Sequence, residues 1–97
     1  MRVISIEQVL PCIADPWKLR LIAQLDERPD LHLLAKHLPG RYSENLGIVI
    51  AKSGYREIIF YRNGKVTVRM VDSPEEGRKF INSMLAMAYN KVLIEEL

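Results

Sequence analysis

The chain has 97 residues, of which 48% are hydrophobic and 27% are charged, and its formal net charge is +2. This balance is that of an ordinary globular domain, and it excludes a disordered protein, a fibrous protein and a chain with two separate cores. A net charge so close to zero does not by itself point to an anionic partner, so such a partner must be inferred from where the cations lie.

The apolar runs are short, as in residues 47–51 and 58–61. Because crossing a bilayer takes about 20 apolar residues, we expect no membrane span. An acid, Glu7, precedes any sustained apolar run, which is not the pattern of a secretory signal. The single cysteine, Cys12, cannot form an internal disulfide and fits a reducing compartment. We expect one cytoplasmic domain over residues 1–97.

The N-terminal segment, residues 1–16, predicts a short helix or turn ahead of the main fold in residues 17–97. Its apolar residues recur at helical intervals until Pro11 interrupts them: Ile6, Val9, Leu10 and Ile13. Pro16 then forces the residue before it out of the helical region, so a new element begins after it.

Residues 18–25 alternate between apolar and polar side chains, which predicts a half-buried strand. Asp30 is suited to cap a helix over residues 31–38, where the apolar residues follow the helical period, and Pro39-Gly40 ends it. A short strand is expected over residues 41–43.

The second half predicts three strands over residues 46–52, 56–62 and 65–71, all rich in β-branched and aromatic residues. Asn63-Gly64 separates the last two and predicts a type I′ hairpin turn, which needs positive φ at both residues. Ser73, Pro74 and Glu76 then form a capping-box pattern that begins a long helix. Its apolar stripe comprises Phe80, Ile81, Met84, Leu85, Ala88 and Val92.

The expected fold class is therefore α+β, in the order β-α-β-β-β-β-α. A single antiparallel sheet with two helices on one face buries the apolar sides of all these elements. The other face of the sheet would then meet solvent or a partner.

Several motifs resemble one repeat of the TATA-binding protein, which forms half of a saddle. The matching residues are Leu31, Leu38-Pro39, Tyr42, Leu46-Gly47-Ile48-Val49, Ile59-Phe60, Asn63-Gly64-Lys65-Val66 and Ser73-Pro74-Glu75. The resemblance implies a TATA-binding-protein-like half fold. Of the two phenylalanines that wedge into DNA in that family, one falls at Tyr61 and the other near Asn45 and Leu46, which departs from the DNA-binding pattern.

Residues 4–90 also look like the module that precedes a small four-cysteine iron–sulfur domain in proteins of methanogens and other anaerobes. The residues that carry this likeness are Leu10-Pro11-Cys12, Ala14-Asp15-Pro16, Arg20-Leu21-Ile22-Ala23, Tyr61 and residues 71–76. The resemblance implies an association with an iron–sulfur protein. With one cysteine the chain cannot ligate a [4Fe-4S] cluster, so a cluster would belong to a further segment or to a partner.

No combination of residues predicts catalysis, a metal site or a bound cofactor. Cys12, His32 and His37 match no zinc spacing, and the two histidines lie about 140° apart around a helix. We interpret them as a core cysteine and two surface histidines. Glu75 and Glu76 belong to the helix cap, and no glycine-rich phosphate loop is present. We expect a protein that is not an enzyme.

Strand alternation identifies the candidate interaction face. If Ile58, Phe60, Val66, Val68 and Met70 point to the core, their neighbours point to the opposite face. That candidate interaction face comprises Arg20, Ile22, Gln24, Ile59, Tyr61, Lys65, Thr67 and Arg69.

This mixture of cations, isoleucines and one aromatic ring predicts a non-catalytic module that docks a protein partner or a second copy of itself, through this face or a sheet edge. A homodimer could form through the edge of the strand at residues 18–25 if the N-terminal segment leaves that edge open. The alternative is a nucleic-acid-binding domain that uses the same face. A solvated sheet face with no partner is the remaining interpretation.

Overall fold

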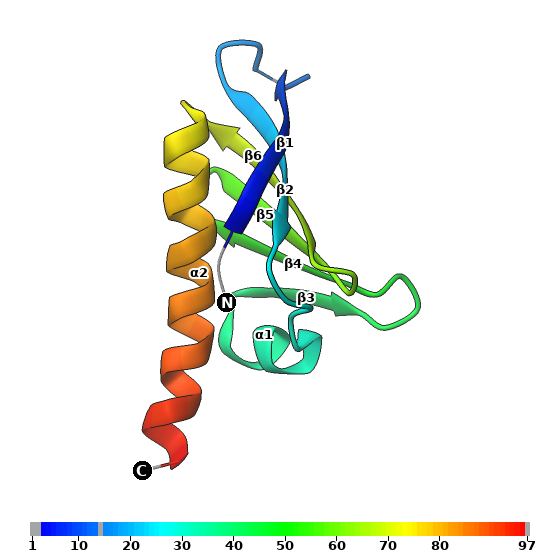
Figure 1. Ribbon diagram of the computed structural model, residues 1–97, viewed down its shortest axis with the longest axis vertical. Coiled ribbons are helices and arrows are strands. Elements are labelled where there is room, and N and C mark those ends of the chain that lie inside the picture. Colours follow the sequence, from blue (N-terminus) through cyan, green and yellow to red (C-terminus); the bar gives the residue numbers. More distant parts are fainter. Residues whose placement is uncertain (1–2, 14, 97) are drawn as a thin grey trace.

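A computed structural model describes residues 3–13 and 15–96, and it contains one six-stranded antiparallel sheet and two helices (Figure 1). The spatial order of the strands is β1-β2-β6-β5-β4-β3. Along the chain the elements are β1 (Val3–Pro11), β2 (Leu19–Leu25), α1 (Leu31–His37), β3 (Gly40–Ser43), β4 (Ile48–Ser53), β5 (Arg56–Tyr61), β6 (Lys65–Val71) and α2 (Pro74–Glu96). From β2 onward this is the predicted order, and the α+β class is confirmed.

The N-terminal prediction was wrong, because residues 3–11 form strand β1 rather than a helix or turn. Two register shifts interrupt its pairing with β2, so Val3, Ile6 and Val9 stand opposite Leu25, Ala23 and Leu21. Each shift adds one residue to the two-residue period of a strand. The resulting spacing of three imitates a helix in the sequence. Residues 1, 2 and 14 of the N-terminal segment lie outside the described residues.

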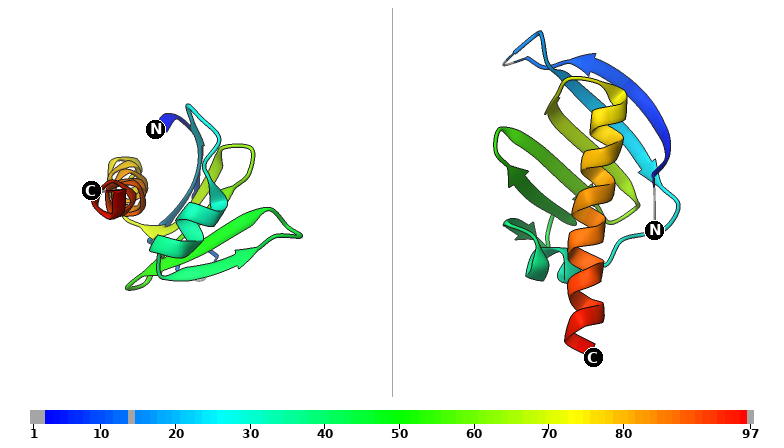
Figure 2. Two further views of the ribbon diagram at one scale, coloured as in Figure 1. Left: turned by 90° about the horizontal axis from the view of Figure 1, so that it is seen from below. Right: turned by 90° about the vertical axis from the view of Figure 1, so that its left-hand side faces the viewer.

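Both helices pack on the same face of the sheet (Figure 2). α2 contacts β1, β2 and β6, while α1 contacts β3 and β4, and the two helices also contact each other. In the described part of the chain no helix covers the opposite face, which we call the open face. Neither described helix combines the length and the apolar character needed to cross a membrane.

The core lies between the sheet and the helices. Alternate strand residues enter it, among them Leu21, Val49, Ile58 and Phe60, each fully buried. From α2 it receives Phe80, Ile81, Met84, Leu85 and Ala88, which confirms the predicted stripe apart from Val92, whose side chain lies outside the described ones.

Met70 departs from the predicted core pattern. Leu19 pairs with Val71 and Arg20 pairs with Arg69, so Met70 is the extra residue of a bulge in β6. Its φ of 67° is positive, and its amide donates a hydrogen bond to Sγ of the buried Cys12. The bulge lets Val71 return to the core, where it is fully buried, and leaves Met70 only half-buried.

The turn between β5 and β6 is not the predicted type I′. Gly64 has a φ of 93°, but Asn63 is not among the described residues with positive φ. The amide of Gly64 donates to the carbonyl of Tyr61, and Asn63 Oδ1 accepts from the amide of Lys65. The hairpin is therefore closed by a tight turn over residues 61–64, in which only the last residue, Gly64, has positive φ.

The predicted helix caps are present. Asp30 Oδ1 accepts a hydrogen bond from the amide of Leu33 at the start of α1. At the start of α2, Ser73 Oγ accepts from the amide of Glu76. The Glu76 carboxylate accepts from the amide of Asp72, one residue before the cap, and also pairs with Arg56.

Candidate interaction face

The open face is built from alternate residues of all six strands. Cross-strand pairing aligns these residues in three rows that run across the strands. The first row contains Leu10, Arg20, Arg69, Glu57 and Lys52. The second contains Gln8, Ile22, Thr67, Ile59, Ile50 and Arg41. The third contains Ser5, Gln24, Lys65, Tyr61, Ile48 and Ser43, in which the contact of the Lys65 ammonium with the Tyr61 ring joins β6 to β5.

Seven of the eight predicted residues line one hollow of about 370 Å³ over β2, β6 and β5. Gln24 is the exception, since its amide donates to the carbonyls of Leu25 and Asn63 at the end of the sheet. The eighth lining residue is Ile13, from the loop between β1 and β2. Sequence alternation could not identify Ile13, because a loop has no fixed period.

The second row makes the middle of the open face apolar. Thr67, with only 9% of its surface exposed, lies between Ile22 and Ile59, and Ile59 is paired in turn with Ile50. A further hollow of about 310 Å³ continues past β4, lined by Ile48, Ile50 and Leu46 together with residues 41–43. Ile48 and Ile50 are not among the eight predicted residues, although the alternation within β4 could have identified them. We call Ile22, Thr67, Ile59 and Ile50 the isoleucine row.

The first row is strongly cationic. Arg20 and Arg69 stand directly opposite each other on β2 and β6. The Glu57 carboxylate lies 3.7 Å from Arg69 and 3.7 Å from Lys52, so one anion is shared by two cations. Nε of Arg20 is buried and has no hydrogen-bond acceptor among the described residues.

The paired strand positions of the open face, taken within the described residues, hold five cations and one carboxylate. The cations are Arg20, Arg41, Lys52, Lys65 and Arg69, and the carboxylate is Glu57. These paired positions therefore carry a net charge of +4, although the whole chain carries only +2. They hold five of the chain's 14 lysines and arginines but only one of its 12 acidic residues.

Tyr61 provides the aromatic ring of the open face. Lys65 Nζ lies 5.0 Å from the centre of the Tyr61 ring, which is the range of a cation–π contact. Leu46, near the second wedge position of the TATA-binding-protein pattern, is 72% exposed in the loop before β4. The two positions contact a common hollow of about 200 Å³ beside Arg62.

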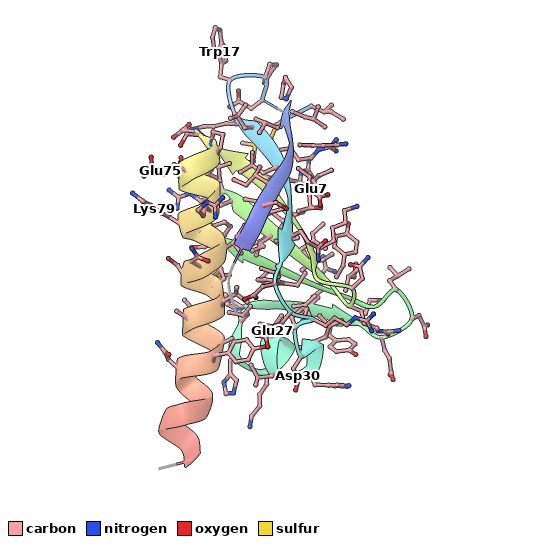
Figure 3. All side chains as sticks on the ribbon, viewed as in Figure 1. Glu7, Trp17, Glu27, Asp30, Glu75 and Lys79 are labelled. Atoms are coloured by element: carbon pink, nitrogen blue, oxygen red, sulfur yellow. The ribbon has the colours of Figure 1, made fainter. Side chains whose placement is uncertain are left out.

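The loop between β1 and β2 presents apolar side chains to solvent at one end of the sheet. Trp17 is 91% exposed and points away from the body of the molecule (Figure 3), and Ile13 is 92% exposed. The Lys18 ammonium donates a hydrogen bond to the Asp72 carboxylate and so attaches this loop to the end of β6. This bond lowers the pKa of Asp72 and raises the pKa of Lys18.

The remaining candidate residues do not form a site. Within the described chain no group of three or more His, Cys, Asp and Glu side chains could hold a metal ion. Cys12 is buried, as predicted, and His32 is exposed beside Tyr42. His37, expected on the surface, is only 8% exposed at the end of α1.

Comparison with models of protein families, with curated protein sequences and with solved structures found no match for this chain.

Proposed function

We propose that the chain is a non-catalytic interaction module that docks a protein partner through the open face. The observation that carries this proposal is the hollow over β2, β6 and β5, where Ile22, Ile59 and Tyr61 remain partly exposed on a sheet face without a helix. Burying such side chains contributes about 25 cal/mol per Å² of apolar surface, and a protein surface is the partner that offers apolar groups in return.

The sequence likeness to the module before four-cysteine domains supports an iron–sulfur protein as the partner, or an iron–sulfur segment of the same polypeptide. The likeness to a TATA-binding-protein repeat concerns the order of elements from β2 to α2. In this proposal the half fold presents its uncovered sheet face to a protein instead of DNA.

Site-specific photo-cross-linking in cells tests the proposal. A photoreactive phenylalanine analogue replaces Tyr61 on the open face, and the control places it at Lys79, which points outward from α2 (Figure 3). We expect Tyr61 to capture a discrete protein that Lys79 does not capture, and we expect Ile59→Asp to abolish that product. Iron and acid-labile sulfide in the captured protein would support the iron–sulfur association. Equal products from both positions would contradict docking through the open face.

A second candidate, nucleic-acid binding, is favoured by the net charge of +4 at the paired positions of the same face. Suppose that Arg20, Lys65 and Arg69 each neutralise one phosphate of duplex DNA. The logarithm of the affinity should then fall linearly with the logarithm of the salt concentration, with a slope of about −2.7. A cross-linked product that nuclease removes, together with this slope in fluorescence anisotropy, would favour this candidate over protein docking.

A further inference from the structure

The first row of the open face has three cations, Arg20, Arg69 and Lys52, but a single anion, Glu57. Like charges directly opposite each other on neighbouring strands destabilise a sheet, and Arg20 and Arg69 have this arrangement. Glu57 is shared between Arg69 and Lys52, and Nε of Arg20 has no acceptor among the described residues. Arg20 is only part-buried, and it lines the hollow together with Arg69. A carboxylate supplied from outside would pair there with their guanidinium groups, which bind carboxylates through two parallel hydrogen bonds.

The isoleucine row lies two residues along the strands from this cationic row, or about 7 Å away. It crosses four neighbouring strands from β2 to β4, so its length is about 14 Å at the usual strand spacing. About ten helical residues cover this length, and their apolar side chains at i, i+4 and i+7 would meet the row. The flanking side chains of such a helix reach the cations beside the row.

The edges of the sheet are poorly suited to adding a strand. β1 is interrupted by two register shifts, and β3 has only four residues. Bulges and short edge strands oppose pairing with a further strand. The face, rather than an edge, is therefore the surface available to a partner.

We infer that the partner docks an acidic amphipathic helix, whose apolar side chains lie on the isoleucine row and whose carboxylates reach Arg20 and Arg69. This inference rests on the proposed function. A second copy of the chain fits less well, because it would place its own five cations against these five. A nucleic acid would satisfy the arginines but would leave the isoleucines without an apolar partner.

The test uses fluorescence anisotropy with two labelled synthetic peptides of about 18 residues, a length at which a peptide helix begins to be stable. Both carry leucines along one helical face. The first has glutamates beside the leucines, and the second has lysines at the same positions. A duplex DNA of similar length is the third probe.

We expect the glutamate peptide to bind at least about tenfold more tightly than the lysine peptide and than the DNA. Arg20→Gln should weaken its binding about tenfold or more, because a charge-assisted hydrogen bond is lost. Ile59→Ala should weaken it by a similar factor. The control Lys79→Gln on α2 should leave binding unchanged. Arg20→Gln should also keep or raise the melting temperature, because it removes the repulsion by Arg69, and a loss of binding without a loss of stability distinguishes contact with the ligand from a structural role.

Equal binding of the two peptides, or unchanged binding by Arg20→Gln, would overturn the inference. If Tyr61 cross-links a protein while the glutamate peptide shows no preference, the acidic helix is wrong and docking stands. Tighter binding of the DNA, with a nuclease-sensitive product at Tyr61, would overturn both proposals in favour of nucleic-acid binding.

Discussion

At the scale of the residue, Met70 holds a backbone conformation that side chains other than glycine rarely adopt. A left-handed φ costs a non-glycine residue about 1 to 2 kcal/mol. Here the bulge geometry and the hydrogen bond from the Met70 amide to Cys12 Sγ maintain it. The bulge also separates the cationic Arg69 from the buried Val71, so it determines where the open face ends.

Substitutions at Met70 should therefore rank by tolerance of positive φ. Met70→Gly relieves the backbone strain, but it loses side-chain contacts and raises the conformational entropy of the unfolded chain. Because these effects oppose each other, we expect a nearly unchanged free energy of unfolding. Met70→Val places a β-branched residue at this φ and should be about 1 to 2 kcal/mol less stable than the glycine variant. Urea denaturation measures the difference. Equal stability of the two variants would contradict the positive φ.

Gly64 and Asn63 make unequal contributions to the β5–β6 turn. A methyl group at Gly64 would lie 2.7 Å from Nε2 of Gln24, and the φ of 93° would strain any side chain. Gly64→Ala should therefore cost at least about 1 to 2 kcal/mol of folding stability. Asn63→Ala loses the hydrogen bond to the Lys65 amide and should cost about 0.5 to 1.5 kcal/mol. A type I′ turn would instead make the two changes similarly costly, so denaturation curves decide between the turns.

At the scale of the element, α2 depends on a glycine in its first turns. A methyl group at Gly77 would collide with Cδ1 of the fully buried Leu21, so this glycine lets the helix approach β2 closely. From the sequence alone Gly77 is a cost of roughly 1 kcal/mol to helix formation relative to alanine. The close packing of α2 against β2 explains this glycine, because no larger residue fits between Leu21 and the helix.

Gly77→Ala should accordingly destabilise the fold despite the better helix propensity of alanine. Overpacking a core costs about 1 to 3 kcal/mol, and the gain in propensity offsets up to about 1 kcal/mol of it. The control is Asn82→Ala on the exposed side of α2, which should be neutral or slightly stabilising. Thermal melting of both variants tests this, and a stabilised Gly77→Ala would mean that α2 lies further from β2.

The β1–β2 hairpin is attached to the end of β6 by the pair of Lys18 and Asp72. Because the folded protein has the lower pKa at Asp72, the pair stabilises it above the ordinary carboxyl pKa of about 3.9, and the effect is lost as pH falls below that value. Asp72→Asn should therefore be less stable than the wild type at neutral pH, and the difference should shrink below about pH 4. A difference that is constant down to about pH 2 would contradict the pairing.

At the scale of the whole molecule, the strand edge considered for a homodimer is already occupied. β1 pairs with β2 along Val3 to Pro11, and Ile22 has partners on both sides, Gln8 and Thr67. A proline at Ile22 would thus disrupt the fold itself instead of an interface. The open face is no better suited to self-association, because the cations at its paired positions would repel those of a second copy.

We therefore expect a monomer in the absence of a partner. Light scattering at tens of micromolar and low salt should give a mass near 11.2 kDa. A mass near twice this value would mean that two copies associate despite the cations of the open face. That result would contradict the argument that these cations select a different, acidic partner. Adding the glutamate peptide should leave one protein copy in each complex.

Local patterns in the amino-acid sequence predict the elements from β2 to α2 and most residues of the candidate interaction face. The alternation in residues 18–25 and 65–71 depends on local geometry, in which neighbouring side chains leave opposite sides of a strand. For this reason Ile22, Thr67 and Arg69 were assigned to one face correctly. The caps at Asp30 and Ser73 are local for the same reason, because their partners are three residues away.

Features that depend on contacts between distant residues could not be predicted from such local patterns. β1 could not be recognised, because residues three apart, as Val3, Ile6 and Val9 are, share one side of a strand only where bulges interrupt it, and these bulges exist only in the pairing with β2. The bulge at Met70 depends on pairing with β2 and on Cys12, which is 58 residues away in the chain. The concentration of five cations on the open face likewise arises from the strand order, since a net charge of +2 does not reveal how the charges divide between the two sides of a sheet.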